Sequence, residues 1–229
     1  DLEFVLHSGH GEFPRAIFAP ADVEECFHLT RRAFDLAEKY QGPMFLLTDQ
    51  FLADSLRSVE PFDAANLPTV APQVAGADLP GPYRRYAITD TGLSPRLVPC
   101  ETPHLVITDS DEHDEEGHIT EDLGIRVRMV DKRLRKGRGI CGEALPPQAT
   151  GHESPDLLLV GWGSTKGAME EAGAVLRDKG KRVGTLHFSQ VWPLVADLFV
   201  PRLEKAGHVV CIESNATAQF SQLIRRETG

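Results

Sequence analysis

The sequence lacks the features that mark membrane, exported and nucleic-acid-binding proteins. No apolar run approaches the ~20 residues that a membrane-spanning helix needs, and residues 1–20 have no signal-peptide layout, so we expect a cytoplasmic protein. The 24 Lys and Arg are outnumbered by 34 Asp and Glu among 229 residues, giving a net charge of −10. This balance argues against nucleic acid and anionic membranes as partners.

Cysteine is scarce, and several familiar catalytic motifs are missing. The four cysteines lie far apart without a CxxC pair, so they predict neither an iron–sulfur ligand set nor a zinc site. There is no GxSxG elbow, and the turn at 161–164 lacks the third glycine and the spacing of GxGxxG and the lysine of a P-loop. The Gly-Trp-Gly-Ser sequence at 161–164 could hold an anion at a helix N-terminus, although a close strand–helix turn is the favoured interpretation.

Residues 1–63 show the pattern of a helix followed by a buried strand. Asp22 and Glu25 form a capping-box signature, and Gly42–Pro43 ends the helix. A short apolar run at 44–47 predicts a buried strand. The expected apolar face of the helix consists of Phe27, Thr30, Phe34 and Ala37.

Residues 64–150 have the pattern of a connector. Eight prolines between Glu60 and Pro103 predict turns, short strands and extended chain, and His104–Thr108 is expected to form a strand. A helix follows, with Thr120 as its expected cap. Its expected apolar face consists of Leu123, Val127, Val130 and Leu134.

Residues 151–229 predict three strand–helix units. Strands are expected at 157–160, 183–188 and 209–212, with helices at 165–179, after Trp192–Pro193 and at 217–226. Such a repeat predicts an α/β fold with a doubly wound parallel sheet. Asn215 or Thr217 is expected to cap the last helix rather than to act as a catalyst.

The segment Asp109–Arg138 changes abruptly from acidic to basic. Its first fourteen residues hold eight carboxylates, and the next sixteen hold seven Lys and Arg against one acid. Glu121 and Asp122 in the first turn of the predicted helix, with Arg133, Arg135 and Lys136 in its last, would complement the helix dipole. The six acids before Thr120 need another explanation.

Three interpretations of the acidic part remain open. Its carboxylates and imidazoles could bind a divalent metal, although His113 and His118 are not spaced i, i+4 as in a helical zinc pair. They could act at a substrate pocket as acid, base or hydrogen-bond partner. They could also form a loop that pairs with the basic helix or with another subunit. We take Asp111, Glu112, His113 and His118 as substrate-proximal candidates and expect no metal.

Several strings, in their order and spacing, resemble the alpha subunit of 2-oxoacid:ferredoxin oxidoreductases, especially the 2-oxoglutarate type. They are Gly9-His-Gly-Glu-Phe-Pro-Arg15, Leu36-Ala-Glu-Lys-Tyr40, Ser110-Asp-Glu-His-Asp-Glu-Glu-Gly-His118, Gly161-Trp-Gly-Ser164 and His187-Phe-Ser-Gln-Val-Trp-Pro193. Ala218 departs from the family, which usually has glycine there, and this affects the expected local backbone geometry.

The resemblance implies a thiamine-dependent oxidative decarboxylation of a 2-oxoacid onto coenzyme A, with electrons passed to ferredoxin. It implies the end of a pyrimidine-binding thiamine domain at 1–63, a connector at 64–150 and a transketolase C-terminal-like domain at 151–229. A beta subunit would hold the diphosphate, its magnesium ion and an iron–sulfur cluster, in a hetero-oligomer.

The resemblance also places the family's main cofactor and substrate motifs before Asp1. We therefore expect a piece of a longer subunit that binds no cofactor alone and is inactive alone. Two alternatives are a non-catalytic module that docks subunits, and a metal-dependent enzyme centred on Asp111–His118.

Overall fold

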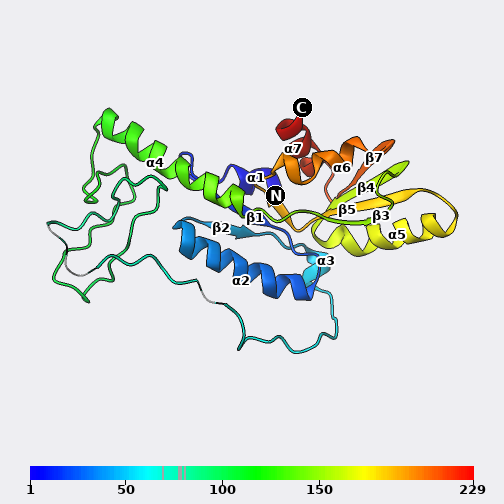
Figure 1. Ribbon diagram of the computed structural model, residues 1–229, viewed down its shortest axis with the longest axis horizontal. Helices are drawn as coiled ribbons and strands as arrows, with labels where there is room; N and C mark the ends of the chain where they lie inside the picture. Colours follow the sequence, from blue (N-terminus) through cyan, green and yellow to red (C-terminus); the bar gives the residue numbers. More distant parts are fainter. Residues whose placement is uncertain (69, 77–78, 80) are drawn as a thin grey trace.

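The protein consists of two β-sheets with flanking helices and one long irregular segment (Figure 1). The computed structural model describes residues 1–68, 70–76, 79 and 81–229. Within these ranges, no helix is both long enough and apolar enough to cross a membrane.

The first sheet has the strand order β2-β1-β6. β1 (Ala16–Phe18) pairs in parallel with β2 (Met44–Leu46), which confirms the predicted strand. β6 (Gln190–Trp192) pairs with β1 in antiparallel orientation. A strand from the predicted C-terminal domain therefore completes the sheet of the predicted N-terminal one.

Helix α2 (Val23–Tyr40) packs against this sheet and confirms the predicted helix. Its N-cap is Asp22, whose side chain accepts from the Glu25 backbone N–H at 2.9 Å. The predicted apolar face is wrong, since Phe34 is 73% exposed and Thr30 is also exposed. The first sheet and Ile140 instead select the face formed by Leu29, Leu36 and Tyr40.

The second sheet confirms the predicted α/β fold with a parallel core. Its order is β3-β5-β4-β7, in which β5, β4 and β7 are parallel and β3 adds an antiparallel edge. The strands are β3 (Gln148–Gly151), β4 (Leu157–Trp162), β5 (Val183–Phe188) and β7 (His208–Ile212).

Both faces of the second sheet are covered. Met169 of α5 (Lys166–Asp178) packs against Leu159 and Val183 on one face. On the other face, Leu158 and Leu186 pack in one apolar cluster with residues of α1 (Leu2–Leu6) and α7 (Gln219–Thr228). The helix expected after Trp192–Pro193 is short: a 3-10 turn at Ala196–Leu198 precedes α6 (Val200–Glu204).

The segment between α3 (Gln50–Ala53) and α4 (Leu123–Gly142) is irregular. Among its described residues there are two isolated bridges, Val74–Arg96 and His113–Ile119, so the short strands expected there are wrong. The strand expected at 104–108 is also wrong, because the described part of the chain offers it no partner strand, and Leu105 is exposed.

Helix α4 exists as predicted but begins and ends elsewhere. Asp122, not Thr120, is its N-cap, and the Asp122 carboxylate accepts from the Ile125 N–H at 2.8 Å. The helix continues to Gly142, so Arg133, Arg135 and Lys136 lie inside it, and its last turn has no basic residue. Its first turn has no acid either. The predicted match between charge order and helix dipole is therefore wrong for the basic residues, whereas Asp122 does place one carboxylate at the N-terminus of the helix.

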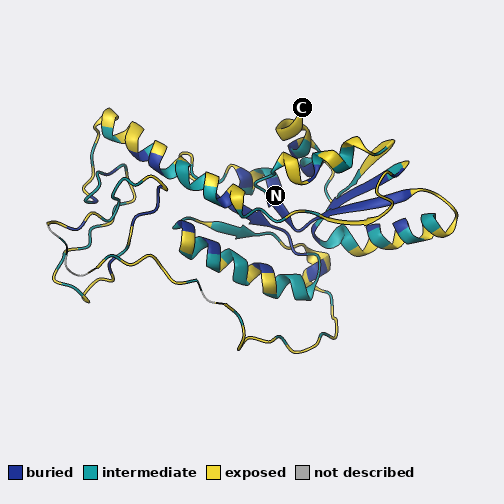
Figure 2. Ribbon diagram, in the orientation of Figure 1, coloured by how far each residue is buried: buried dark blue, intermediate teal, exposed yellow. Residues whose placement is uncertain are grey.

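Three of the four residues of the expected apolar face of α4 are exposed, and the fourth, Val130, is half-buried. Leu123 is 76% exposed, Val127 60% and Leu134 46%. The residues that the helix buries are Met129, Lys132 and Ile140. Figure 2 shows the exposed end of α4 extending beyond the two sheets.

A single carboxylate joins the two halves of the chain. Glu25 of α2 accepts from the Ala21 N–H at 2.9 Å, which completes the cap of α2. It also accepts from the Ser189 hydroxyl at 2.8 Å, from the Gln148 amide at 3.1 Å and from Lys166 Nζ at 3.4 Å. Glu25 therefore ties α2 to β3, to α5 and to the residue before β6.

The departure at Ala218 has a visible backbone consequence. Ala218 is the N-cap of α7 and has φ 51° and ψ 47°, in the left-handed region that favours glycine. The family's usual glycine at this position would fit the same backbone without strain.

We predict that Ala218→Gly stabilises the protein by about 0.5–1 kcal/mol, because relief of the strained backbone outweighs the added entropy of the unfolded chain. Urea unfolding measures the change. Ala172→Gly, at an exposed position inside α5, is the matched control and should cost about 1 kcal/mol. A destabilised Ala218→Gly variant would contradict the backbone assignment.

Candidate functional site

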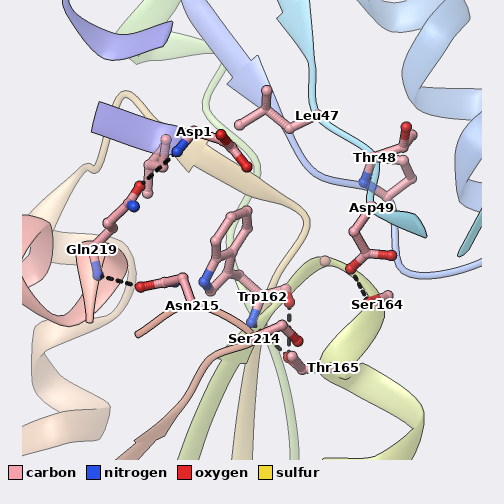
Figure 3. A pocket seen from close by; sticks show the side chains of 13 residues that line it. Asp1, Leu47, Thr48, Asp49, Trp162, Ser164, Thr165, Ser214, Asn215 and Gln219 are labelled. Carbon is pink, nitrogen blue, oxygen red and sulfur yellow. Dashed lines mark hydrogen bonds between the residues drawn. The ribbon is translucent and has the colours of Figure 1, made fainter. Parts of the chain in front are cut away.

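A crevice lies where the carboxyl ends of strands from both sheets meet (Figure 3). Pro20 follows β1, Leu47–Asp49 follow β2, Gly163–Thr165 follow β4, and Ser214–Asn215 follow β7. Open parallel sheets bind ligands outside the carboxyl ends of their strands. The cavity holds about 120 Å³, which suits a small group rather than a large cofactor.

The crevice is lined mainly by hydroxyl, amide and apolar groups. The lining residues are Asp1, Leu2, Pro20, Leu47, Thr48, Asp49, Trp162, Gly163, Ser164, Thr165, Ser214, Asn215 and Gln219. None of them is a lysine or arginine.

Asp49 and Ser164 connect the two walls of the crevice. The Ser164 hydroxyl donates to the Asp49 carboxylate, as the dashed line in Figure 3 shows. The other Asp49 oxygen caps α3 by accepting from the Leu52 N–H at 2.9 Å. Because both oxygens are engaged, Asp49 serves the structure of the crevice in this arrangement.

Residues 161–164 form one wall of the crevice and make the close strand–helix turn that the sequence predicted. β4 continues to Trp162 and a 3-10 turn, Gly163–Thr165, leads into α5. Thr165 holds this turn by accepting from the Trp162 N–H at 3.1 Å and donating to the Trp162 carbonyl at 2.8 Å. The turn fits closely, since a Cβ at position 161 would lie 2.7 Å from Thr165 Oγ1.

His187 supports the same turn from below. Its side chain is fully buried in β5, and Nε2 lies 2.9 Å from the Gly163 carbonyl oxygen, so Nε2–H is the donor. Burial lowers the pKa of His187, which favours the neutral imidazole. Among the described residues, its buried Nδ1 has no hydrogen-bond partner.

Glu213 was not among the candidates predicted from the sequence, yet its carboxylate binds the residues that form the crevice wall at Trp162 and Asn215. Its carboxylate accepts from the Phe220 and Ser221 N–H groups at 2.9 Å each, at the N-terminus of α7. The Trp162 indole and the Asn215 amide also donate to it, at 3.3 and 2.7 Å. Burial would raise the pKa of Glu213, but these donors outweigh it and hold the pKa below its ordinary value.

Asn215 acts at the same helix end, as expected from the sequence. Its side-chain oxygen accepts from the Gln219 N–H at 3.1 Å. Thr217 instead accepts from the Gln219 side chain at 3.2 Å, so it does not cap the helix. The signal that could have revealed Glu213 is its place directly after β7 and ahead of a helix.

The acidic candidates lie apart from this crevice, in a turn that docks on α4. None of Asp111, Glu112, His113 and His118 lines the crevice. Two of them face inward, namely Glu112 and His113, whereas Asp111 and His118 are exposed.

Glu112 holds the turn on the helix. Arg133 of α4 donates to both of its carboxylate oxygens, at 3.0 and 2.8 Å. These bonds lower the pKa of Glu112 against the opposing effect of burial. For Glu112, pairing of the acidic loop with the basic helix is therefore confirmed.

His113 is 9% exposed and packs on Tyr86, with ring centroids 3.8 Å apart. Its Nδ1 lies 2.8 Å from the Asp111 carbonyl oxygen and therefore carries the proton in the neutral ring. Tyr86 in turn lies against the buried Lys132, 5.8 Å from Nζ to the ring centroid. Burial, then repulsion by neighbouring cations, lowers the pKa of Lys132 to about 8.

The tip of the turn is held by its own backbone. One Asp114 oxygen accepts from the N–H groups of Glu116, Gly117 and His118 at 2.9–3.0 Å. Gly117 has φ +97°, and a Cβ there would lie 2.5 Å from the Ile107 carbonyl oxygen. In the described part of the chain, no three His, Cys, Asp or Glu side chains are grouped to hold a metal ion.

α/β proteins with a parallel sheet and a polar crevice at its strand ends form a class that binds ligands or cofactors in that crevice, and the structure places this chain in that class. The sequence profile described as "Pyruvate flavodoxin/ferredoxin oxidoreductase, thiamine diP-bdg" matches residues 1–132. The chain belongs to this family.

Curated relatives are similar in sequence over the whole or nearly the whole of this chain. Subunit alpha of 2-oxoacid:ferredoxin oxidoreductase 2 from Aeropyrum pernix is 34% identical and matches 100% of this chain, which spans 36% of that relative. The 2-oxoglutarate oxidoreductase subunit KorA of Mycobacterium tuberculosis is 30% identical over 98% of this chain and 34% of its own length. The chain thus spans about a third of these relatives.

A solved structure shares the fold. The 2-oxoglutarate:ferredoxin oxidoreductase from Magnetococcus marinus, with 2-oxoglutarate, coenzyme A and succinyl-CoA bound, superposes with a TM-score of 0.91 at 28% identity. The match covers 100% of this chain and 40% of that one.

We predict that Glu213→Gln destabilises the protein by about 1–2 kcal/mol at pH 7, because the helix loses a charged acceptor. The folded pKa of Glu213 lies below its unfolded value, so its contribution is complete above about pH 4.3 and is lost as the pH falls through the folded pKa. Urea unfolding from pH 7 to pH 3 should therefore bring wild type and variant together at low pH.

Glu171→Gln, at an exposed position on α5, is the matched control and should change stability little at any pH in this range. A gap between wild type and Glu213→Gln that stays constant down to pH 3 would contradict the role of the ionised carboxylate.

Proposed function

We propose that this chain works in the alpha subunit of a 2-oxoacid:ferredoxin oxidoreductase, with 2-oxoglutarate as the substrate. The complex would decarboxylate the 2-oxoacid oxidatively, transfer the acyl group to coenzyme A and pass two electrons to ferredoxin in the cytoplasm. The single observation that carries this proposal is the superposition of all of this chain on 40% of the Magnetococcus chain, supported by relatives named as 2-oxoacid and 2-oxoglutarate oxidoreductase subunits.

Thiamine diphosphate would supply the carbanion chemistry when bound, but the crevice at the strand ends does not form a complete site for it. The crevice holds about 120 Å³, below the ~300–1,000 Å³ typical of ligand pockets, and no lysine or arginine lines it. As the resemblance to the family implies, we propose that a partner beta subunit holds the diphosphate, its magnesium ion and an iron–sulfur cluster.

The residues of this chain act mainly by positioning. Glu25 and the β1–β6 pairing hold the two sheets together, and Glu213 fixes the wall that carries Trp162. Glu112 and Arg133 set the acidic turn on α4. This leaves Asp111 and His118 exposed, where they can face substrate or the partner subunit.

The direct test of the function is 2-oxoacid-dependent reduction of a viologen dye by the complete complex, with coenzyme A present. We expect turnover with 2-oxoglutarate to exceed turnover with pyruvate. Absence of turnover with every 2-oxoacid tried would contradict the proposal. We also expect this chain, without the rest of the alpha subunit, to be inactive when it is mixed with the beta subunit. Turnover comparable to that of the complete enzyme would contradict this expectation.

We predict that Asp111→Asn in the complete complex changes the KM for the 2-oxoacid by about tenfold, because it removes a charge near the substrate without disturbing a buried contact. Steady-state kinetics measure KM and kcat separately. Asp90→Asn, at another exposed loop position, is the matched control and should leave both constants unchanged.

His113→Ala tests the inward side of the same turn. Loss of the Tyr86 contact should lower the melting temperature and change kcat, since the turn shifts on α4. If KM and kcat stay unchanged in both the Asp111 and His113 variants, a role of the turn on the substrate side is wrong.

A further inference from the structure

Arg15 is a buried cation that has no carboxylate partner in the described part of the chain. The residue is 6% exposed. Its Nη1 donates to the Val5 carbonyl oxygen at 2.7 Å and to the Ser8 hydroxyl at 3.0 Å, and both acceptors are neutral. Burial lowers the pKa of Arg15, and no carboxylate among the described residues counters this effect. A buried charge of this kind is costly until an opposite charge reaches it.

Two aromatic rings hold the guanidinium in its position. The Arg15 Cζ lies 4.1 Å from the centroid of the Phe13 ring and 5.6 Å from the centroid of the Phe45 ring. Cation–π contacts offset part of the cost of burial, but they do not replace acceptors for the N–H groups. The guanidinium is therefore fixed in place without being neutralised.

The loop before Arg15 sets the position of the Phe13 ring. Gly9 has φ +100° and Gly11 has φ +74°, both in the region that favours glycine. A Cβ at position 9 would lie 2.8 Å from Phe13 Cε1, so only a glycine lets the ring pack this closely on the loop. Since Phe13 in turn contacts Arg15, the local sequence of the loop determines where the cation lies.

The free donors of Arg15 are accessible from a groove. Arg15 lines a groove of about 420 Å³ where α1, α4, the 11–15 loop and the end of β6 come together (Figure 1). Among the described residues, its Nε and Nη2 have no hydrogen-bond partner, and neither atom is sealed from solvent as the Arg32 Nε is. Two adjacent N–H donors of a guanidinium match the two oxygens of a carboxylate.

The exposed charges at the rim of the groove do not replace this missing partner. Arg226 lines the groove, and its Nε pairs with Glu227 at 3.1 Å. Glu12 is the acid among the described lining residues, but it is exposed and forms no ion pair within the described chain. Water and salt screen an exposed charge, whereas the buried Arg15 lacks that screening.

The walls of the groove indicate what is attached to the carboxylate. Phe13, Trp192 and Pro193 provide apolar surface beside Arg15. A fully hydrated inorganic anion gains little from such walls, whereas a carboxylate that carries apolar carbon can use both the donors and the walls.

We propose that Arg15 and this groove form a carboxylate-binding site. Nε and Nη2 donate to the two carboxylate oxygens, and the attached carbon atoms lie against Phe13 and Trp192. An organic acid from solution has this chemistry, and so has an Asp or Glu side chain from the part of the polypeptide outside this chain. The site is separate from the crevice at the strand ends and does not depend on the proposed activity.

The first test is the binding of butyrate to the complete polypeptide, followed by the thermal midpoint at constant ionic strength with chloride as the reference. Butyrate should raise the midpoint saturably. Arg15→Lys should weaken its apparent Kd at least about tenfold, because an ammonium cannot donate two parallel bonds. Arg225→Gln, at an exposed position on α7 outside the groove, is the matched control and should bind butyrate as wild type does.

The second test applies if a side chain of the polypeptide already occupies the site, so that butyrate does not bind. The pKa of that carboxylate would be lowered by Arg15, so its contribution is complete above about pH 4.3 and is lost as the pH falls through the folded pKa. In urea unfolding, Arg15→Lys should therefore be less stable than wild type at pH 7, and the difference should disappear at low pH. Glu12→Gln should leave this difference unchanged.

Three results would overturn the proposal. One is the absence of butyrate binding together with a difference between wild type and Arg15→Lys that does not depend on pH. Another is loss of that difference in the Glu12→Gln background, which would identify Glu12 as the partner. The third concerns wild type alone and holds even if Arg15→Lys does not fold: crystals of the complete polypeptide grown with 4-bromobutyrate would show only water at Nε and Nη2. The proposal expects either the bromine signal beside Trp192 or an Asp or Glu carboxylate on Arg15.

Discussion

The structure depends on the junction at which β6 pairs with β1 and Glu25 gathers donors from both halves of the chain. β6 lies more than 170 residues from β1 in the sequence, yet it adds an antiparallel edge to the first sheet. Glu25 lies beside this pairing and accepts four hydrogen bonds. The donors are Ala21 just before α2, Gln148 of β3, Lys166 of α5 and Ser189 before β6. A largely buried carboxylate is stable only with such donors, so the junction forms as a whole. The crevice at the strand ends exists because this junction fixes one sheet against the other.

A second consequence of polar contacts is the orientation of α4. Hydrophobic burial alone would turn Leu123, Val127 and Leu134 inward, but the Glu112–Arg133 pair and the Lys136 contact hold the basic face there. The basic face packs against Tyr86 and the acidic turn. Burial of Lys132 is costly, and its lowered pKa reflects this cost.

Local patterns in the sequence predicted the elements better than their faces. The parallel strands β4, β5 and β7 and helices α2, α4, α5 and α7 follow from apolar runs, caps and glycines, all of which act over a few residues, whereas the exposed edge strand β3 was missed. The exposed face of α2 could not be predicted, since Ile140, about 100 residues away, decides which face is buried. β6 was also missed, because a three-residue strand next to a proline has no periodicity of its own. Of the candidate site, the acidic turn was visible as a charge pattern, and the resemblance pointed to the family. The crevice was not visible, because it is assembled from single residues after four separate strands.

Hydrogen exchange of the whole chain tests the junction most directly. The Ala19 N–H donates to Ser189 across the two halves at 2.8 Å, and Leu159 lies in the centre of the second sheet. If the junction makes the two sheets one cooperative unit, both amides should exchange with the same free energy of opening, and Glu25→Gln should lower that free energy by the same amount for both. Exchange of Ala19 through a far smaller opening than Leu159, unchanged by Glu25→Gln, would contradict the account.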